Sequence, residues 1–478
     1  MYRWRDVLML MAAIAVAGSG CAQTGRDRLA ALPHDAPVAA PETTLADLPE
    51  VARSAMPDVT GAAMQMPDEE SPERNADAAS RAATEGVPPE NDPSRLTLEY
   101  LTRLAVENHP LLRRDVARIE AAAGGALQAG LYPNPRFDTN NPQVFNGPNT
   151  SLNVGIQQDI VVKGKLRLDR AAALRVQQQS EFALLQDRYA LLGLVRNQFY
   201  TTLAAQYRVD VLSRLLKMTE YSVTIGKQLR EAFIGDQTQV YLLEIDYNRV
   251  KADLLNAQQV LAGERRQLAA IVGFPELVDQ KVVGSLTASP PSFDEELARQ
   301  FVTSENAMVQ IAKLDIDRNR ILLKRAEAEP YPNITVGPAY QYGFNKTQEQ
   351  YWMTIVFPIP VSDRNQGNIR SARANIRDST ETLGTVQLDL LRKVADSLST
   401  HRGALEQAER YRTQIIPDAR EALRLGRSGY RNGVAEFAVY YQAQQAIIDA
   451  TKAYVDILEK VWTTASDLSG LLQMDKFP

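Results

Sequence analysis

YPNPRF (132–137) returns 199 positions further along the chain as YPNITV (331–336). Two more landmarks recur at nearly the same offset, a glycine in a helical context and an apolar run. They are AFIGDQTQV (232–240) with YRNGVAEFA (430–438), 198 apart, and LAAIVG (268–273) with LSGLLQ (468–473), 200 apart. Offsets this constant indicate an internal duplication. We therefore predict a first repeat at 96–285 and a second at 286–478.

Each repeat is expected to open with a helix. Thr97 can cap LEYLTRLAVEN (98–108), because its hydroxyl can accept a bond from an otherwise unpaired N–H of the first turn. A similar helix is expected in FDEELARQFVTSEN (293–306). The two predicted repeats therefore begin alike.

Strand-like alternation of apolar and polar residues follows each YPN motif. It covers 152–160 in the first repeat, and 334–344 and YWMTIVF (351–357) in the second. The turns are marked by Asn146-Gly147 and Asn345-Lys346. Alternating runs of about ten residues with aromatic ends are typical of membrane β-strands. An ordinary hairpin on a soluble core is the alternative.

Long helices fill the rest of each repeat. From Leu166 to about Ala232 there is neither proline nor turn signal, and apolar residues recur at spacings of three and four. At about 1.5 Å per residue such a helix is on the order of 100 Å long. The chain is expected to turn after Gly235 and return. The second repeat follows the same scheme from about Gly367 to Leu472, and Pro417 is expected to kink its helix.

The N-terminal region resembles an export signal followed by a tether. Residues 1–20 start with Arg3 and Arg5 and continue through an apolar run to small residues, the order of a secretory signal. Cys21 follows and resembles the acylated cysteine of bacterial lipoproteins; ordinary signal cleavage that leaves an incidental cysteine is the alternative. Residues 21–95 are rich in proline, acidic and small residues, which predicts a disordered linker.

The bulk composition excludes several functions. A net charge of −5 gives no concentrated basic surface for nucleic acid. One cysteine allows no disulfide within the chain, and the three histidines lack metal-ligand spacing. We find no nucleophile motif and no phosphate loop, so we expect neither enzyme activity nor a metal or other cofactor. No stretch after the signal is long and apolar enough for a membrane-spanning helix.

The predicted strands cannot act alone. Two hairpins supply four strands, and an open sheet edge has no place in lipid because its backbone groups would lack partners. The smallest bacterial barrels have about eight strands. Strands must therefore be pooled between subunits, and two or three copies both satisfy this requirement. The long amphipathic helices need neighbours for the same reason.

These features together resemble the TolC-like outer-membrane efflux protein family over residues 96–475. The most specific stretch is FPIPVSDRNQGNIRSARANI (357–376), which is similar to the strand-to-helix junction of outer-membrane factors paired with metal-exporting resistance-nodulation-division pumps. The resemblance implies a mainly α fold with a membrane β-barrel part: a homotrimer with a twelve-strand β-barrel and a twelve-helix α-barrel. It implies a passive duct in the outer membrane, reaching into the periplasm. Small molecules or metal ions would come from an inner-membrane pump through a periplasmic adaptor.

The resemblance also implies roles for individual residues. Gly235 and Gly433 would lie at the helical tips that touch the adaptor. Tyr430 matches a tyrosine that helps to hold the closed tip. The acidic ring of many relatives is absent, because Val439 and Gln442 stand at its positions. In the first repeat Glu244, with Asp246 nearby, can form a carboxylate ring that favours cations; a solvated helix-face charge is the alternative.

Aromatic residues of the second hairpin are candidates for the membrane interface. They are Tyr340, Tyr342, Tyr351 and Trp352. Two other functions stay open at this stage. One is a lipid-anchored coiled-coil scaffold in the periplasm, and the other is a type I protein-secretion duct.

Overall fold

The computed structural model describes residues 96–139, 151–232, 235–343, 349–432 and 434–477, all within one compact unit of the chain. The predicted signal, Cys21, the linker up to residue 95, both predicted hairpin turns and Gly433 lie outside the described residues. Among the described helices none has the length and apolar character needed to cross a membrane.

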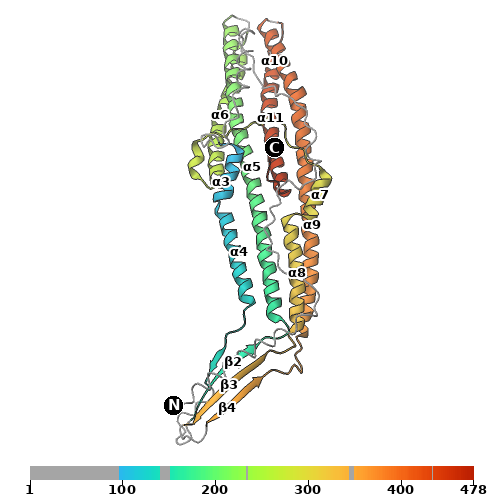
Figure 1. Ribbon diagram of the computed structural model, residues 1–478. Helices are drawn as coiled ribbons and strands as arrows, with labels where there is room; N and C mark the ends of the chain where they lie inside the picture. Colours follow the sequence, from blue (N-terminus) through green and yellow to red (C-terminus); the bar gives the residue numbers. More distant parts are fainter. Residues whose placement is uncertain (1–95, 140–150, 233–234, 344–348, 433, 478) are drawn as a thin grey trace, which may run out of the picture. The chain divides into compact units, whose positions relative to one another are not determined.

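The two predicted repeats contain the same order of elements (Figure 1). Before residue 285 these are α3 (Leu98–Asn108), α4 (Pro110–Ala129), β1 (Arg136–Asp138), β2 (Ser151–Ile160), α5 (Lys165–Glu231), α6 (Gln237–Val272) and the 3₁₀ turn η4 (Pro275–Asp279). After it they are α7 (Glu295–Ser304), α8 (Ala307–Ala328), β3 (Ile334–Gly343), β4 (Gln350–Val356), α9 (Gln366–Arg410), η5 (Tyr411–Ile415), α10 (Ile416–Arg431) and α11 (Phe437–Leu471). The repeat boundaries at 285 and 286 stay our prediction.

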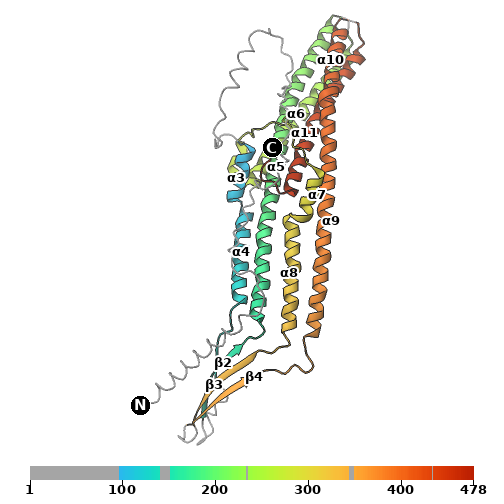
Figure 2. The same ribbon diagram turned by 45° about the vertical axis from the view of Figure 1, so that its right-hand side comes forward.

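The four strands form one antiparallel sheet in the order β1-β2-β3-β4. The central pair joins the two repeats, with Ile160 opposite Ile334 and Val154 opposite Tyr340. The helices that adjoin the strands follow the same order, since α4 packs on α5, α5 on α8 and α8 on α9 (Figure 2). The strand predictions at 152–160, 334–344 and 351–357 are confirmed within one or two residues.

The long helix predicted from Leu166 is confirmed by α5, which has 67 residues. Thr97 caps α3 as predicted, because its hydroxyl accepts the Tyr100 N–H at 3.3 Å. Pro417 interrupts its helix as predicted: the α-helical ladder gives way to a π-turn over Tyr411–Ile415, just before the proline that lacks an N–H donor. We did not predict α4 and α8. Their starts are signalled by N-caps at His109 and Asn306.

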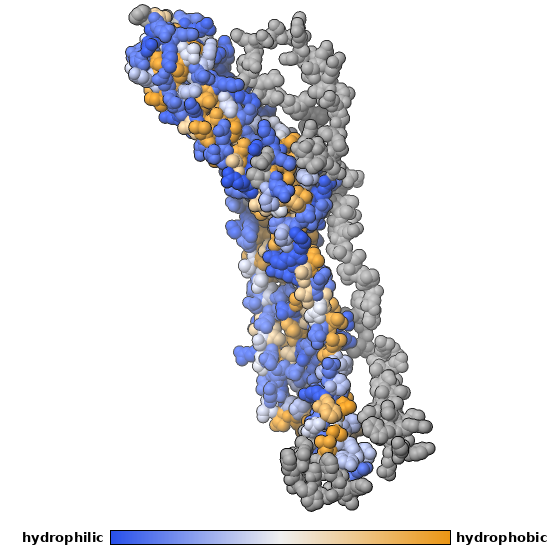
Figure 3. All heavy atoms as spheres, turned by 90° about the vertical axis from the view of Figure 1, so that its left-hand side faces the viewer, coloured by the Kyte–Doolittle hydropathy of each residue, from blue (hydrophilic) through white to orange (hydrophobic). Residues whose placement is uncertain are grey.

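The main core lies where α3, α5 and α11 meet. Trp462 is 2% exposed, stacks on Tyr200 at 4.4 Å between ring centroids and donates its indole N–H to the Leu286 carbonyl at 2.8 Å. Burial raises the pKa of Tyr200 to about 12. Burying side chains of this size stabilises the fold by about 1.5–3 kcal/mol each. Away from this core, hydrophobic residues on the visible face are interspersed among hydrophilic ones (Figure 3).

Candidate gate at the helical tips

Two helical hairpins carry the predicted gate residues. The first turns between α5 and α6, the second between α10 and α11, and the helix ends at Glu231 and Arg431 are 200 positions apart. At that offset the counterpart of Gly235 is Ala435. Their N–H groups make the same closing bond, to the carbonyls of Leu229 at 3.1 Å and Gly429 at 3.0 Å. Gly235 and Ala435 are therefore structural counterparts, whereas Gly433 lies outside the described residues.

Tyr430 ties the second hairpin to the first. Its hydroxyl donates to Gln239 Oε1 at 2.7 Å, and its ring stacks on Tyr440 with centroids 5.3 Å apart. Tyr430 is 7% exposed, and burial raises its pKa, so the hydroxyl keeps its proton. The predicted gate tyrosine is thus placed between the two repeats, with an amide as its partner.

Tyr440 makes a second bond between the hairpins. The fully buried hydroxyl donates to Ser222 Oγ at 2.6 Å and lies 3.0 Å from Gln444 Oε1. The ring packs beside Leu243, which is not exposed at all. The tip therefore holds a small apolar cluster, and hydrogen bonds surround it.

Asp246 lies on α6 and is 2% exposed. Its carboxylate accepts the Tyr441 hydroxyl at 3.3 Å and the Gln445 side-chain amide, both from α11. Burial raises the pKa of Asp246 more than these bonds and the nearby Arg249 lower it. Asp246 therefore joins the repeats inside one chain.

Glu244 has a partner in its own hairpin. Lys227 of α5 lies 2.8 Å from its carboxylate, and the Glu244 side chain is about one-third exposed. An ion pair reduces the field of the carboxylate, so the structure favours neither a bare acidic ring nor a fully solvated charge. The three-fold ring stays a prediction.

A polar ladder continues from Asp246 along the same two helices, and sequence reasoning missed it. Seven residues beyond Asp246, Asp253 pairs with Lys452 of α11 at 2.5 Å. Gln445 and Lys452 are also seven apart. Seven residues are about two helical turns, so these side chains share a face. Polar residues with matched heptad spacing on α6 and α11 were the available signal.

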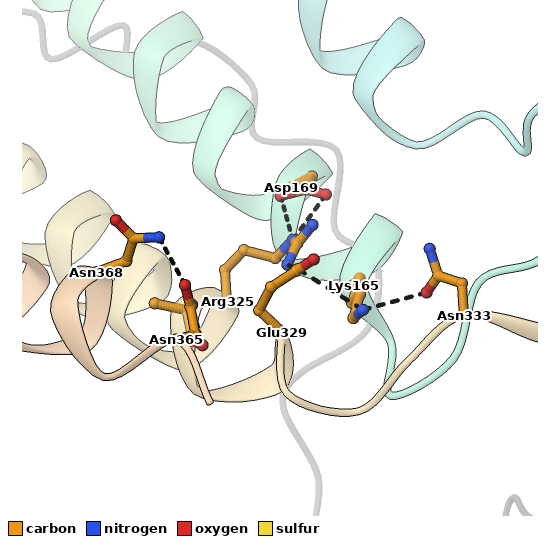
Figure 4. Close-up of polar contacts among 8 residues, drawn as sticks. Lys165, Asp169, Arg325, Glu329, Asn333, Asn365 and Asn368 are labelled. Carbon is orange, nitrogen blue, oxygen red and sulfur yellow. Dashed lines mark hydrogen bonds and ion pairs between the residues drawn. The ribbon is translucent and has the colours of Figure 1, made fainter. Parts of the chain in front are cut away.

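A second polar cluster lies where the strands meet the helices (Figure 4). Lys165 is 2% exposed and donates to Asn333 Oδ1 at 3.2 Å, with Glu329 3.6 Å away. The Arg325 guanidinium bonds both Asp169 oxygens at 2.8 and 3.0 Å, and it also contacts Glu329. A buried ammonium needs such partners to offset its lost hydration. The cluster joins α5 to α8, and Asn333 belongs to the YPN motif.

The predicted interface aromatics lie on β3 and β4. Tyr340 and Tyr351 are opposite each other in the register, with ring centroids 4.9 Å apart. Tyr342 is 41% exposed and Trp352 is 36% exposed. Their place at a lipid interface stays a prediction. Within the described residues no cluster of three or more histidine, cysteine or acidic side chains could hold a metal ion.

Comparison with known proteins finds relatives in the sequence and in the fold. The family model described as "Outer membrane efflux protein" matches residues 300–472. The cobalt-zinc-cadmium resistance protein CzcC of Cupriavidus metallidurans is 23% identical over 410 residues, which cover 83% of this chain and 94% of CzcC. Outer membrane protein OprJ of Pseudomonas aeruginosa is 24% identical over 395 residues, which cover 75% and 80%.

The fold is shared with a solved outer membrane protein, VceC of Vibrio cholerae. The TM-score is 0.67 at 18% identity, and the match covers 79% of this chain and 96% of VceC. Two other solved proteins with this fold are described as outer membrane channels, OprN and MtrE of Neisseria gonorrhoeae. This likeness favours a channel over the lipid-anchored scaffold. Residues 300–472 thus match the outer membrane efflux proteins, and the chain has the fold of the TolC-like channels.

Proposed function

We propose that three copies of this chain form the outer-membrane duct of a tripartite efflux system, which works with a periplasmic adaptor and an inner-membrane pump of the resistance-nodulation-division type. The proposal is supported by the relatives, by the open strand edges of one chain, and by the helical hairpins. In this proposal the duct does no chemistry. It opens and closes at the tips.

The observation that carries the gate is the set of bonds between the two hairpins. Tyr430 to Gln239, Tyr440 to Ser222, and Asp246 to Tyr441 and Gln445 each join one repeat to the other. Two of these four bonds are neutral and are worth about 1 kcal/mol each, whereas the two to the Asp246 carboxylate are worth about 1.5–3 kcal/mol each when it is charged. Bonds of this strength stabilise a closed resting state but still allow the tips to open, because an adaptor that contacts the tips can replace them.

We propose metal ions as the cargo class, because CzcC, a cobalt-zinc-cadmium resistance protein, matches more of this chain than OprJ does. A type I protein-secretion duct is the alternative. The test is deletion of the gene in its host, followed by growth on graded cobalt, zinc and cadmium. Increased sensitivity that the intact gene restores supports the proposal. Unchanged metal tolerance with loss of a secreted protein favours the alternative.

Channel formation is tested with purified protein in planar bilayers. We expect stepwise, cation-selective conductance. Glu244→Gln beside wild type tests the carboxylate ring: lower cation selectivity supports it, while unchanged selectivity leaves the duct and removes the ring. No conductance under conditions in which a known channel inserts would contradict the proposed duct.

A further inference from the structure

The described sheet and helices end in two open edges. β1 and α4 form one edge, and β4 and α9 form the other. The N–H and C=O groups on the outer side of an edge strand are a template for another chain. The question is which residues each edge offers, and the internal duplication answers it.

The contact between the repeats inside the chain provides the pattern; we call it the inner junction (residues 162–165 and 331–334). Lys163 Nζ lies 4.1 Å from the centre of the Tyr331 ring, and Lys165 donates to Asn333 at 3.2 Å. Val162, Pro332 and Ile334 help to line a hollow of about 420 Å³ beside them. The junction thus consists of a cation over an aromatic ring, and a donor on an asparagine.

Each residue of the inner junction has a counterpart on an open edge. Arg136 is opposite Gln157 in β1 and β2, and Thr335 is opposite Val356 in β3 and β4. Both strands of the first repeat therefore correspond to those of the second at an offset of 199. The N-caps of α5 and α9, Gly164 and Asn365, share the left-handed conformation, with φ of 64° and 59°. The helices therefore correspond at an offset of 201.

These offsets match four residues by chemistry as well as by position. Tyr331 and Asn333 correspond to Tyr132 and Asn134, and Lys163 and Lys165 correspond to Arg364 and Gln366. The aromatic ring, the asparagine, the cation and the hydrogen-bond donor are all present. They are separated, however, because the first two lie on the β1 edge and the last two follow β4.

The separated residues are exposed. Tyr132 is 62% exposed, and Asn134, Arg364 and Gln366 also lie at the surface. No described residue gives the side chain of Tyr132, Asn134 or Arg364 a partner. Val361, which corresponds to Val162 at the strand offset of 199, is 73% exposed. Each edge is thus one half of a junction that the chain completes only once by itself.

We propose that a second copy of this chain completes the outer junction in the register of the inner one. Arg364 lies over the Tyr132 ring of the second copy, and Gln366 donates to its Asn134. Along the strands, Val356 is opposite Asp138 of the second copy. This register follows when β4 pairs with β1 of the second copy as β2 pairs with β3 inside one chain. Head-to-tail contacts of this kind close into a ring when the rotations between successive copies add up to a full turn. The proposal rests on the proposed multi-subunit duct and adds its edge, register and recognition pair.

Double-cysteine variants test the register. Opposite residues in an antiparallel pair have Cα atoms about 4.5–5.5 Å apart, within disulfide range. Inside one copy the same residues are three strand spacings apart, roughly 14 Å, so a disulfide must join two copies. We expect Asp138→Cys with Val356→Cys to give covalent oligomers after mild oxidation of membranes. Thr139→Cys with Ile355→Cys is a second in-register pair.

The matched control is Phe137→Cys with Val356→Cys, which shifts the register by one and turns one thiol to the other face. We expect no covalent oligomers from it, nor from single variants that retain Cys21. Covalent oligomers that form only with the shifted pair would overturn the outer junction and leave the duct intact. The same conclusion would follow if no cysteine pair gave covalent oligomers in a protein that still conducts. A protein that neither conducts nor forms any oligomer, covalent or non-covalent, would overturn both the outer junction and the duct.

The recognition pair has its own test, the rate at which the oligomer dissociates in heated detergent. We expect Arg364→Gln and Tyr132→Leu each to raise this rate about 2–5-fold, the equivalent of one exposed cation–π contact. The double variant should be no worse than either single variant, because one contact is lost. Arg364→Lys should remain close to wild type, and Arg370→Gln, an exposed arginine on α9, should be neutral. Additive effects would contradict the pair.

Discussion

Removing one hydroxyl at the tip should open the duct. Tyr430→Phe deletes the donor of the 2.7 Å bond to Gln239 and keeps the ring that stacks on Tyr440. Gln239 is half-buried, so water can satisfy its amide afterwards. The loss is therefore about 1 kcal/mol per chain. If three tips open together, about 3 kcal/mol shifts the ratio of closed to open states by roughly 100-fold.

Single-channel recording measures this ratio as open probability. Tyr221→Phe is the control, because Tyr221 is 48% exposed on α5 and its hydroxyl has no hydrogen-bond partner among the described residues. We expect frequent openings from Tyr430→Phe and wild-type behaviour from the control. A wild-type open probability in Tyr430→Phe would refute the reasoning. So would equal opening in both variants, because hydroxyl loss at any site would then suffice.

Three further predictions follow from the same contacts. Burial raises the pKa of Asp246, so the closed tip binds a proton more tightly than an open, hydrated tip does. Acidification towards this raised pKa should therefore favour closure. In single-channel recordings, Asp246→Asn should abolish this pH dependence. Arg196→Met should lower the free energy of unfolding by about 3 kcal/mol in urea titrations. Arg188 is only partly buried and pairs with Asp475, so Arg188→Met should lower it by less than about 1 kcal/mol. Gly235→Ala should leave thermal stability and conductance unchanged, since an added Cβ meets its nearest atoms at 3.4 Å and the second tip has alanine there; loss of folding would contradict this equivalence.

The long elements were predictable because their signals are periodic and local. The apolar stripe of α5 marks residues that the structure buries, such as Val195, Phe199 and Leu203. Strand alternation marks β2, β3 and β4, and the constant offset marks the duplication. The two shorter helices α4 and α8 were missed because only their caps announce them. His109 is an uncommon N-cap, and Asn306, a favoured one, was taken as the last residue of the helix predicted over 293–306.

The contacts between the two hairpins could not be predicted from these patterns, because they join residues about 190 to 220 positions apart. Tyr430 suggested a closing role, but nothing local selects Gln239 as its partner. Asp246 was predicted as a pore candidate beside Glu244, whereas the packing of α11 buries it. Glu244 was predicted either to form a carboxylate ring or to be a solvated charge, although Lys227 of α5 forms an ion pair with it inside the same hairpin. A side chain's surroundings depend on the packing of several helices, which periodicity in one helix does not determine.

The same packing explains why the tips, and not the middle of the helices, should move. Near Trp462 the repeats are joined by a large apolar core, and the buried Arg196 guanidinium also bonds the backbone carbonyls of Met474 and Asp475 at 2.8 and 2.6 Å. Separating helices there would expose apolar area and strand a buried charge. At the tips the apolar cluster is small, and polar groups that water can satisfy make the remaining contacts. Local opening costs least where few apolar contacts are lost, so the hairpins can part while the core around Trp462 stays closed.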